Sequence, residues 1–277
     1  MFASDQDEDR TEISKGYPFI QIHSNPQRHS SPVRKWLIPW RPKMKEEFSK
    51  RLKKKALDLG ADVVGIAGKE GFGQAPEGYR PENILRGATC VISLGFAQPN
   101  TVVEKAMPTQ YTRNIFTTAS LADKVAHLLS LWIEEQGYEA IPISARGMYM
   151  AAMAGEFRGD LSHKHTAVLA GLGEIGVNTL LINPEFGNRL MLSSIVTNAT
   201  LVHDKPFSDK LCQWGECLKC VEVCPVKAIS ANGRIEKIKC AKYYRSHEDI
   251  YKETWGLYFC RECRRVCPSG ISKKRKN

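Results

Sequence analysis

The cysteines constrain this chain more than any other feature. Eight of the nine fall into two runs toward the C-terminal end. The runs are Cys212, Cys217, Cys220, Cys224 and then Cys240, Cys260, Cys263, Cys267. Each run closes with the spacing Cys-x2-Cys-x3-Cys-Pro. A tight turn of this spacing presents thiolates to an iron–sulfur cluster, so the sequence predicts two 4Fe-4S clusters.

The closing cysteine of each run is expected to serve the other cluster. In two-cluster ferredoxins the Cys that precedes proline ligates the more distant centre. The first cluster is therefore assigned to Cys212, Cys217, Cys220 and Cys267, and the second to Cys224, Cys240, Cys260 and Cys263. The four residues between Cys212 and Cys217 exceed the usual two, which makes Cys212 the unusual ligand.

Clustered cysteines have two other common explanations. Paired runs also form zinc sites with four sulfur ligands, but proline after both closing cysteines favours iron–sulfur clusters. Disulfide frameworks are typical of small secreted domains. Residues 1–10 are acidic without an apolar core, so they resemble neither a signal peptide nor a twin-arginine leader. A cytoplasmic protein is expected.

The length of 277 residues suits two domains better than one. We predict an irregular leader over residues 1–42, an α/β body over residues 43–202, and a ferredoxin-like double-cluster module with a basic tail over residues 203–277. The leader holds five prolines among polar residues and shows no apolar periodicity. No stretch of the sequence is long and apolar enough for a membrane span.

The net charge of +10 is concentrated in two segments. Residues 41–55 hold eight basic residues against two glutamates, and residues 273–276 add four basic residues. Such surfaces attract phosphate backbones, so a nucleic-acid partner such as tRNA is one interpretation. A solvated helix face with a solubilising tail is the interpretation that we favour.

The body alternates helical and strand-like segments, which indicates a mixed α/β fold. Apolar residues recur at three- and four-residue steps over residues 44–59 and 119–136, where helices are predicted. Buried strands are predicted at residues 61–67, 88–94 and 138–144. Cys90 lies in the second strand and is interpreted as a small core residue.

A glycine string, Gly171-Leu172-Gly173-Glu174-Ile175-Gly176, follows a predicted short helix. That helix spans residues 163–170 and has Ser162 as its expected N-cap. The string has the glycine spacing of a dinucleotide fingerprint, but that motif must follow a strand and open a helix. A nicotinamide site is therefore not expected here.

The residues after the string predict a hairpin. Strand-like residues 180–183 and 189–197 flank a turn that contains Gly187. Glycines in this region would let the backbone approach a large flat ligand, or they would only permit tight turns. Both interpretations stay open at this point.

The segment from Ala170 to Gly187, together with the double cysteine run behind it, resembles the epoxyqueuosine reductases and the reductive dehalogenases. The similarity extends over about residues 45 to 270. It implies a nitroreductase-like α/β body that binds cobalamin (a corrinoid), coupled to the double-cluster module. In those families the clusters relay single electrons to the corrinoid, while the protein supplies burial and electrostatics.

By the same resemblance, the glycine loop and the hairpin would line the corrinoid. The residues concerned are Gly171, Leu172, Gly173, Ile175, Gly176, Asn178, Thr179, Asn183, Pro184, Gly187 and Arg189. The expected partners are a low-potential electron donor of the ferredoxin or flavodoxin type and a small-molecule substrate.

A reductase of this kind also needs a proton donor. Epoxyqueuosine reductases carry an Asp-x-x-Pro-x-x-Glu-Arg stretch before the glycine string, and Phe157 stands where its aspartate belongs. The remaining candidates are Asp160, His163 and Tyr149, because carboxyl, imidazole and phenol groups can all act as general acids. The tryptophan and lysine usual at positions 174 and 177 are also replaced.

These observations predict an oxidoreductase that passes electrons through two 4Fe-4S clusters to a corrinoid and so reduces an organic substrate. The alternative is a non-catalytic electron-transfer protein or partner subunit, whose basic surfaces would dock to an acidic enzyme.

Overall fold

The computed structural model describes residues 42–146, 159–245 and 259–271, all within one compact unit, residues 40–277. Its helices are α1 (Pro42–Asp58), α2 (Pro81–Ile84), α3 (Asn100–Lys105), α4 (Pro108–Glu135), α6 (His163–Leu169), α7 (Lys219–Glu222), α8 (Lys237–Arg245) and α9 (Glu262–Arg265). Its strands are β1 (Val63–Gly68), β2 (Cys90–Ala97), β3 (Ala140–Ile143), β4 (Glu174–Ile175), β5 (Leu181–Ile182) and β6 (Leu190–Thr197). Short 3-10 turns lie at η1 (Lys69–Phe72) and η3 (Pro268–Gly270).

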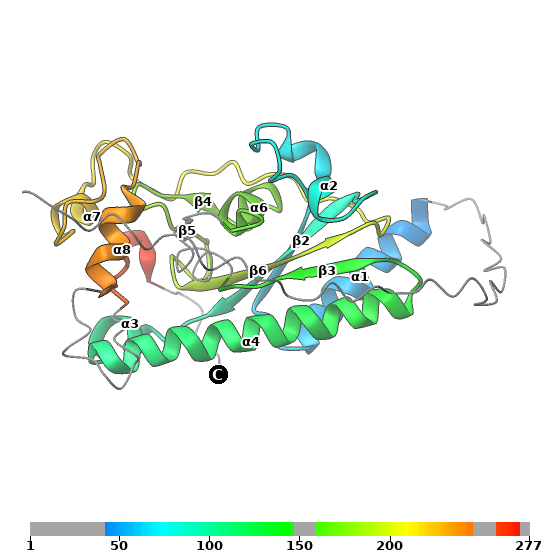
Figure 1. Ribbon diagram of the computed structural model, residues 1–277, viewed down its shortest axis with the longest axis horizontal. Coiled ribbons are helices and arrows are strands. Elements are labelled where there is room, and N and C mark those ends of the chain that lie inside the picture. Colours follow the sequence, from blue (N-terminus) through cyan, green and yellow to red (C-terminus); the bar gives the residue numbers. More distant parts are fainter. Residues whose placement is uncertain (1–41, 147–158, 246–258, 272–277) are drawn as a thin grey trace, which may run out of the picture. The chain divides into compact units, whose positions relative to one another are not determined.

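The main sheet has four strands in the order β1-β2-β6-β3, and every neighbouring pair is antiparallel. The two central strands, β2 and β6, are each eight residues long and almost wholly buried. Figure 1 shows α4 along one face of this sheet and α6 on the other. The predicted mixed α/β fold is confirmed, whereas the nitroreductase-like description stays a prediction.

Each face of the sheet carries its own core because successive strand residues point to opposite sides. Ile92, Leu94 and Ile195 pack against α1 and α4. On the other face, Val91 and Val196 pack against α6. The body is thus three layers deep, with the sheet between α1 and α4 on one side and α6 on the other.

The predicted helices and strands of the body are present, with shifted ends. α4 begins at Pro108, well before the predicted start at Ala119. The earlier start was missed because the first turns of α4 bury Tyr111 and Thr112 and carry no stripe of aliphatic residues. Pro108 is compatible with the first turn of a helix, since the N–H that proline lacks has no hydrogen-bond partner in the helix at that position. α1 ends before Gly60, whose φ of +113° suits glycine.

The predicted hairpin of residues 180–183 with 189–197 is wrong. β5 pairs with β4 instead, in the register Glu174↔Ile182, while β6 joins the main sheet between β2 and β3. In the described chain only the bridge between Asn183 and Gly187 links the two arms. The Asn183 side chain closes this turn, since its Oδ1 accepts the Glu185 N–H at 2.9 Å and the Phe186 N–H at 3.0 Å.

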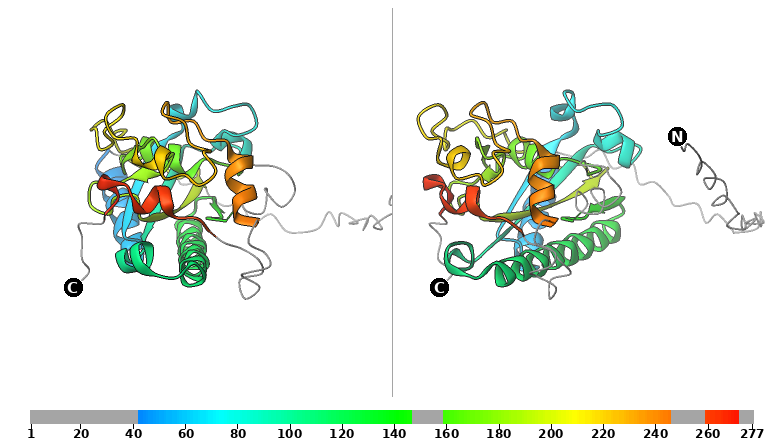
Figure 2. Two further views of the ribbon diagram at one scale, coloured as in Figure 1. Left: turned by 90° about the vertical axis from the view of Figure 1, so that its left-hand side faces the viewer. Right: turned by 60° about the vertical axis from the view of Figure 1, so that its left-hand side comes forward.

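The cysteine-bearing elements gather at the end of the body near α3. Figure 2 shows α8 in orange and α9 with η3 in red at this end of the body, and α9 contacts α3 and α7. A small core of Val177, Cys220, Cys224, Ala228 and Ile229 lies between these elements and the glycine string. Among the described helices, none combines the length and the apolar character needed to cross a membrane.

The predicted leader lies outside the described residues except for Pro42, and the predicted division at residues 202 and 203 stays a prediction.

Candidate functional site

Four thiols of the first group line one pocket. Cys212, Cys217, Cys220 and Cys267 all lie in its wall, although Cys267 comes from the second run. The pKa of Cys267 is raised to about 11, mainly by burial and further by negative charge on the other three thiols. These four sulfurs therefore interact with one another as a set.

The other four thiols form a second, adjoining group. Cys224, Cys240 and Cys263 share one small packing cluster. Burial raises the pKa of Cys260 to about 11, and the charges of Cys240 and Cys224 add to that rise. The pKa of Cys263 rises to about 12 by burial, with Cys260 and Cys240 contributing. Cys224 thus acts on Cys260 of the second group, but the packing cluster also contains Cys212 and Cys220 of the first group, so the assignment of Cys224 to the second cluster stays a prediction.

The donor set suits 4Fe-4S clusters. Each such cluster takes four thiolates, and the eight cysteines lie on loops and short helices around one pocket and one small packing cluster. Among the residues that the structure describes, no three His, Cys, Asp or Glu side chains are placed to hold a single metal ion. The raised pKa values of Cys260, Cys263 and Cys267 mean that these three thiols are protonated at neutral pH without metal. Cluster binding would therefore release protons as thiolates form.

The glycine loop of the body is bonded directly to the second group. Asn178 is buried, and its Nδ2 donates to the carbonyl of Cys263 at 3.0 Å. Lys164 Nζ on α6 donates to the carbonyl of Thr179 at 2.6 Å. Thr179 has a φ of +59°, a left-handed conformation that non-glycine residues seldom adopt. Two side chains thus hold this loop against the cysteines.

The turn before β6 is bonded to the C-terminal segment. Arg189 is fully buried and donates from Nε to the carbonyl of Gly270 at 3.0 Å. Its other nitrogens reach Asn100 on α3, at 2.8 Å, and Glu104, at 3.1 Å. Arg189 therefore ties the start of β6 to α3 and to η3.

The residues predicted to line a corrinoid make contacts with protein. A Cβ at Gly171 would lie 2.7 Å from the Lys205 carbonyl oxygen, and one at Gly173 would collide with the Ile182 carbonyl. Gly187 meets the backbone of Gly270 in the same way. These glycines have a packing role here, so a corrinoid at this loop stays a proposal.

Of the other residues predicted to line a corrinoid, some contact protein and others are partly or fully exposed. Asn183 Nδ2 donates to the Leu172 carbonyl at 2.6 Å, which closes the loop internally. Gly176 lies beside Cys212, since a Cβ there would stand 3.4 Å from its Sγ. Ile175 is half-buried and Pro184 is exposed.

A larger pocket lies beside β3, with a volume of about 640 Å³. Such a volume is in the range of roughly 300–1,000 Å³ that small-molecule sites occupy. Its wall is formed by Gly78, Tyr79, Asn83, Ile84, residues 141–144 and Asp160. Asp160 supplies the one carboxyl group of this wall, so the structure places a predicted proton donor at a pocket.

His163 lies next to the pocket and uses both ring nitrogens. Nε2 is 3.0 Å from the Ser144 carbonyl, and Nδ1 is 2.8 Å from the Ser194 hydroxyl. A carbonyl only accepts, so Nε2 carries the proton and Nδ1 accepts from Ser194. Burial is the largest effect on the pKa of His163 and lowers it. The hydrogen bond to the Ser144 carbonyl and the charges of Asp123 and Asp160 act in the opposite direction. The imidazole is therefore neutral, and its two hydrogen bonds connect the start of α6 to the end of β3 and to β6.

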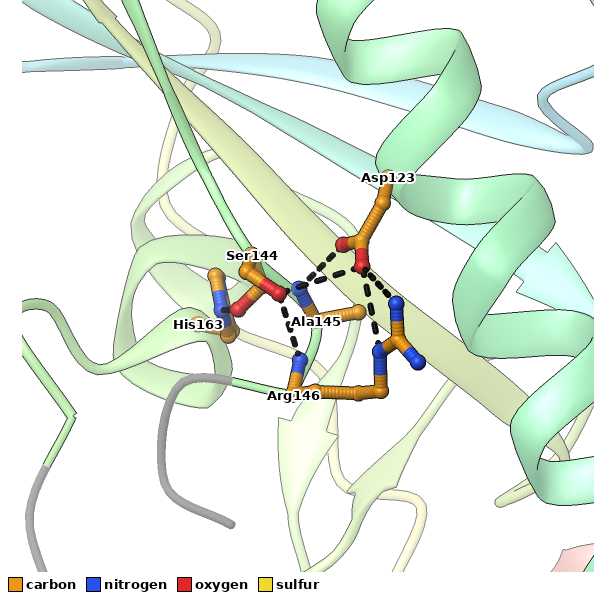
Figure 3. A network of polar contacts seen from close by, with 5 residues as sticks. All are labelled: Asp123, Ser144, Ala145, Arg146 and His163. Atoms are coloured by element: carbon orange, nitrogen blue, oxygen red, sulfur yellow. Dashed lines mark hydrogen bonds and ion pairs between the residues drawn. The ribbon is translucent and has the colours of Figure 1, made fainter. Parts of the chain in front are cut away.

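The end of β3 is fixed by a polar network, drawn in Figure 3. Asp123 on α4 accepts the Ala145 N–H at 2.8 Å and the Ser144 hydroxyl at 3.1 Å. Arg146 forms an ion pair with the same carboxylate at 3.2 Å. Together with His163, these contacts hold residues 144–146 at the pocket edge. Tyr149 lies outside the described residues.

The predicted N-cap of α6 is only partly as expected. Ser162 occupies the N-cap position, but its hydroxyl contacts His165 Nδ1 at 2.7 Å instead of a backbone N–H.

Sequence reasoning gave no role to Lys164, Ser144, Asp123 or Arg264. Lys164 was visible only as a cation between two histidines, and no local pattern shows that it faces cysteines. Glu174 was visible as a departure from the residue usual in relatives. The structure gives it two bonds, from the N–H groups of Leu211 at 2.7 Å and Cys212 at 2.9 Å.

Comparisons with known proteins agree with this arrangement. Residues 212–270 match the family model of the 4Fe-4S double cluster binding domain, which supports two clusters. An epoxyqueuosine reductase of Lactococcus garvieae is 33% identical over 198 residues, which are 69% of this chain and 55% of that protein. The epoxyqueuosine reductases are homologues of this chain. The chain spans about half the length of the curated relatives that it matches.

Solved structures share the fold. An epoxyqueuosine reductase bound to an epoxyqueuosine-modified tRNA-Tyr stem loop has a TM-score of 0.59 at 19% identity, covering 83% of this chain and 67% of that one. A reductive dehalogenase, whose structure suggests a mechanism for B12-dependent dehalogenation, has a TM-score of 0.54 at 21% identity, covering 72% and 29%. The predicted resemblance to both families is confirmed.

Proposed function

We propose that this chain is an iron–sulfur reductase in which two 4Fe-4S clusters serve a substrate site in the body. One observation carries the proposal. The cysteine-bearing segment lies against the glycine loop, with Asn178 bonded to the carbonyl of Cys263 and Gly176 beside the sulfur of Cys212. Such placement connects cysteine chemistry to the body through a few bonds rather than through a flexible linker.

The clusters would be held by the two thiol groups and would supply one-electron transfer. The first is assigned to Cys212, Cys217, Cys220 and Cys267, and the second to Cys224, Cys240, Cys260 and Cys263. The chain itself provides burial, backbone N–H donors to sulfur such as Ala228 N to Cys224 Sγ at 3.2 Å, and a rigid connection to β6.

The acceptor is proposed to be a corrinoid, by similarity to the B12-dependent dehalogenase. The glycine positions are filled by protein contacts, so no step is assigned to a corrinoid there. The pocket beside β3 is proposed as the substrate side of the site, with Asp160 as the proton donor. Asp160 is preferred to His163 for that role, because both ring nitrogens of His163 are hydrogen-bonded to protein.

The substrate is proposed to be an epoxide-bearing nucleoside in tRNA, by similarity to the relative solved with a modified tRNA stem loop. The basic helix α1 exposes Lys43, Lys50 and Lys54, which suit contact with phosphates. This part of the proposal predicts a steep loss of RNA affinity as salt concentration rises.

The first test is a metal and cofactor count on protein purified without oxygen. About eight irons per chain are expected, since each cluster holds four. Added hydroxocobalamin should bind stoichiometrically and change its visible spectrum. Absence of iron would contradict the whole proposal, whereas iron without corrinoid binding would contradict only the acceptor.

The second test concerns the proton donor. Asp160→Asn should lower turnover of the modified RNA by about a hundredfold, in the range of general acid catalysis, while the cluster spectrum stays unchanged. Asp209→Asn, at an exposed carboxylate, is the matched control. Equal turnover in both variants would remove Asp160 from the mechanism.

A non-catalytic electron-transfer protein is the second candidate. The observation that favours it is the close packing of Gly171, Gly173 and Gly187 against protein backbone on the side where a Cβ would lie. Iron without corrinoid, together with fast electron exchange with a partner enzyme, would favour this candidate.

A further inference from the structure

The two thiol groups are flanked by charges of opposite sign. Beside the second group, Lys164 lies on α6, and its pKa is lowered to about 8 by burial and by Lys237 and Arg264. Negative charge on Cys263 and Cys240 acts on Lys164 in the other direction and favours its charged form. Geometry gives the same proximity, because Lys164 Nζ donates to the carbonyl of Thr179 at 2.6 Å while the neighbouring Asn178 donates to the carbonyl of Cys263 at 3.0 Å.

Arg264 adds a second positive charge at the same place. It follows Cys263 in the chain, and its charge favours the thiolate of that cysteine. Its guanidinium is held by the carbonyl of Asn188, whose own Nδ2 donates to the Arg264 carbonyl at 3.1 Å. Two fixed cations therefore border the second group.

The first group borders a carboxylate. Glu174 lies in β4 with its side chain 12% exposed, and its Oε2 accepts from the N–H groups of Leu211 and Cys212. Negative charge on Glu174 disfavours the thiolate of Cys212. Lys210 approaches the same carboxylate only at 3.6 Å, from a side chain that is 84% exposed, so it screens the charge weakly.

We propose that Lys164 raises the reduction potential of the cluster at the second group, and that Glu174 lowers the potential of the cluster at the first. The inference rests on the proposed function only in requiring that both clusters form. Reduction adds one negative charge to a cluster, so a nearby cation stabilises the reduced form and a nearby anion disfavours it. The two residues therefore bias a shared electron toward the second group.

Burial acts on the second group in the opposite direction. Cys224 is buried and Cys240, Cys260 and Cys263 are half-buried, and a low dielectric disfavours added charge. The order of the two potentials in the unmodified protein therefore combines both effects. Changes of charge at single positions isolate the contribution of Lys164 and of Glu174.

The experiment is a redox titration of the full chain without oxygen, followed by the paramagnetic signals of the reduced clusters. Dithionite supplies the electrons. The signals are assigned with Cys217→Ser, which alters the first cluster, and Cys260→Ser, which alters the second. The test variants are Lys164→Gln and Glu174→Gln, both of which remove charge and keep a polar side chain.

Lys164→Gln should make reduction of the second cluster about tenfold less favourable, a shift of about 59 mV to lower potential for one electron. Glu174→Gln should shift the first cluster by a similar factor in the opposite direction. Lys164→Arg should restore the unmodified potential, which a purely structural role for the amine would not predict. Lys124→Gln, at an exposed position of α4, is the control and should shift neither cluster.

Unchanged potentials in both test variants, with iron retained, would overturn the inference. If the Lys164→Gln variant loses iron, the titration of Glu174→Gln tests the inference instead. In that case, a first cluster whose reduction potential does not rise in Glu174→Gln overturns the inference. Absence of clusters in the unmodified protein is a separate outcome, which contradicts the proposed function instead.

Discussion

The guanidinium of Arg189 donates a hydrogen bond to the carbonyl of Gly270, 3.0 Å away, and so joins the sheet to the last described turn of the chain. Arg189 is fully buried, and Asn100 and Glu104 occupy its remaining nitrogens. Such a cation is stable inside the protein only while each of its donors has a partner.

Replacing Arg189 with Met should therefore destabilise the chain. The change removes the Arg189 donors from the Gly270 and Asn100 carbonyls, although the Gly270 carbonyl still accepts from the Asn188 N–H at 3.2 Å. We expect a loss of about 3 kcal/mol or more in the free energy of unfolding. Denaturant unfolding measures this loss. Arg51→Met on exposed α1 is the control, with an expected change of less than about 1 kcal/mol. Similar losses in both variants would contradict the structural role.

The grouping of thiols predicts which cluster each cysteine serves. Cys267→Ser should weaken the same paramagnetic signal as Cys217→Ser, although Cys267 belongs to the second run. Cys90→Ser, in the core of β2 away from both groups, should keep about eight irons, the content of two four-iron clusters. A Cys267→Ser variant that instead matched Cys260→Ser would place the closing cysteines with their own runs.

The buried glycines predict a packing cost. Gly187 has a φ of +57°, and a Cβ there would collide with the Gly270 backbone. Gly187→Ala should lower the free energy of unfolding by about 2 kcal/mol or more. Gly73 has a φ of −56° and a nearest neighbour at 3.7 Å, so Gly73→Ala is the matched control and should be neutral or slightly stabilising. Thermal unfolding compares the two.

The neutral His163 predicts a loss of stability in acid. Burial holds its folded-state pKa below the ordinary value of 6.5, so the unfolded chain binds more protons as the pH falls. The stability from this residue is full above about pH 6.5 and is lost as the pH falls through the lower folded-state pKa. His163→Gln should flatten the fall of stability with pH, whereas His127→Gln, exposed on α4, should not. Parallel curves would contradict the assignment.

The sequence predicted the local elements better than their pairing. Periodic apolar residues identified α1 and the strands of the body, because burial on one face depends on neighbours three or four positions away. The partner of residues 181–182 is β4, which is only two residues long and carries no strand pattern. The hairpin prediction therefore chose the adjacent segment rather than the true neighbour.

The candidate site likewise combines features that the sequence predicts with features that it does not. Cysteine spacing suffices to predict two clusters, since the ligands of each centre recur at short fixed intervals. The surroundings of those cysteines come from distant segments. Lys164 and Glu174 approach them only after α6 and β4 have packed against residues 211–267, and no interval in the sequence encodes that approach.

The predicted exchange of Cys224 and Cys267 between the two groups has a consequence for how this part of the chain matures. A nascent chain ending after residue 245 already carries five of the eight clustered cysteines, yet it completes neither group. Both predicted centres need cysteines from the last segment before they are complete. That segment must return to the first run, which closes a loop of more than forty residues from residue 224 to residue 267. Iron insertion and the docking of the C-terminal segment would then be a single cooperative event, and a chain shortened at its C-terminal end would lose both centres together.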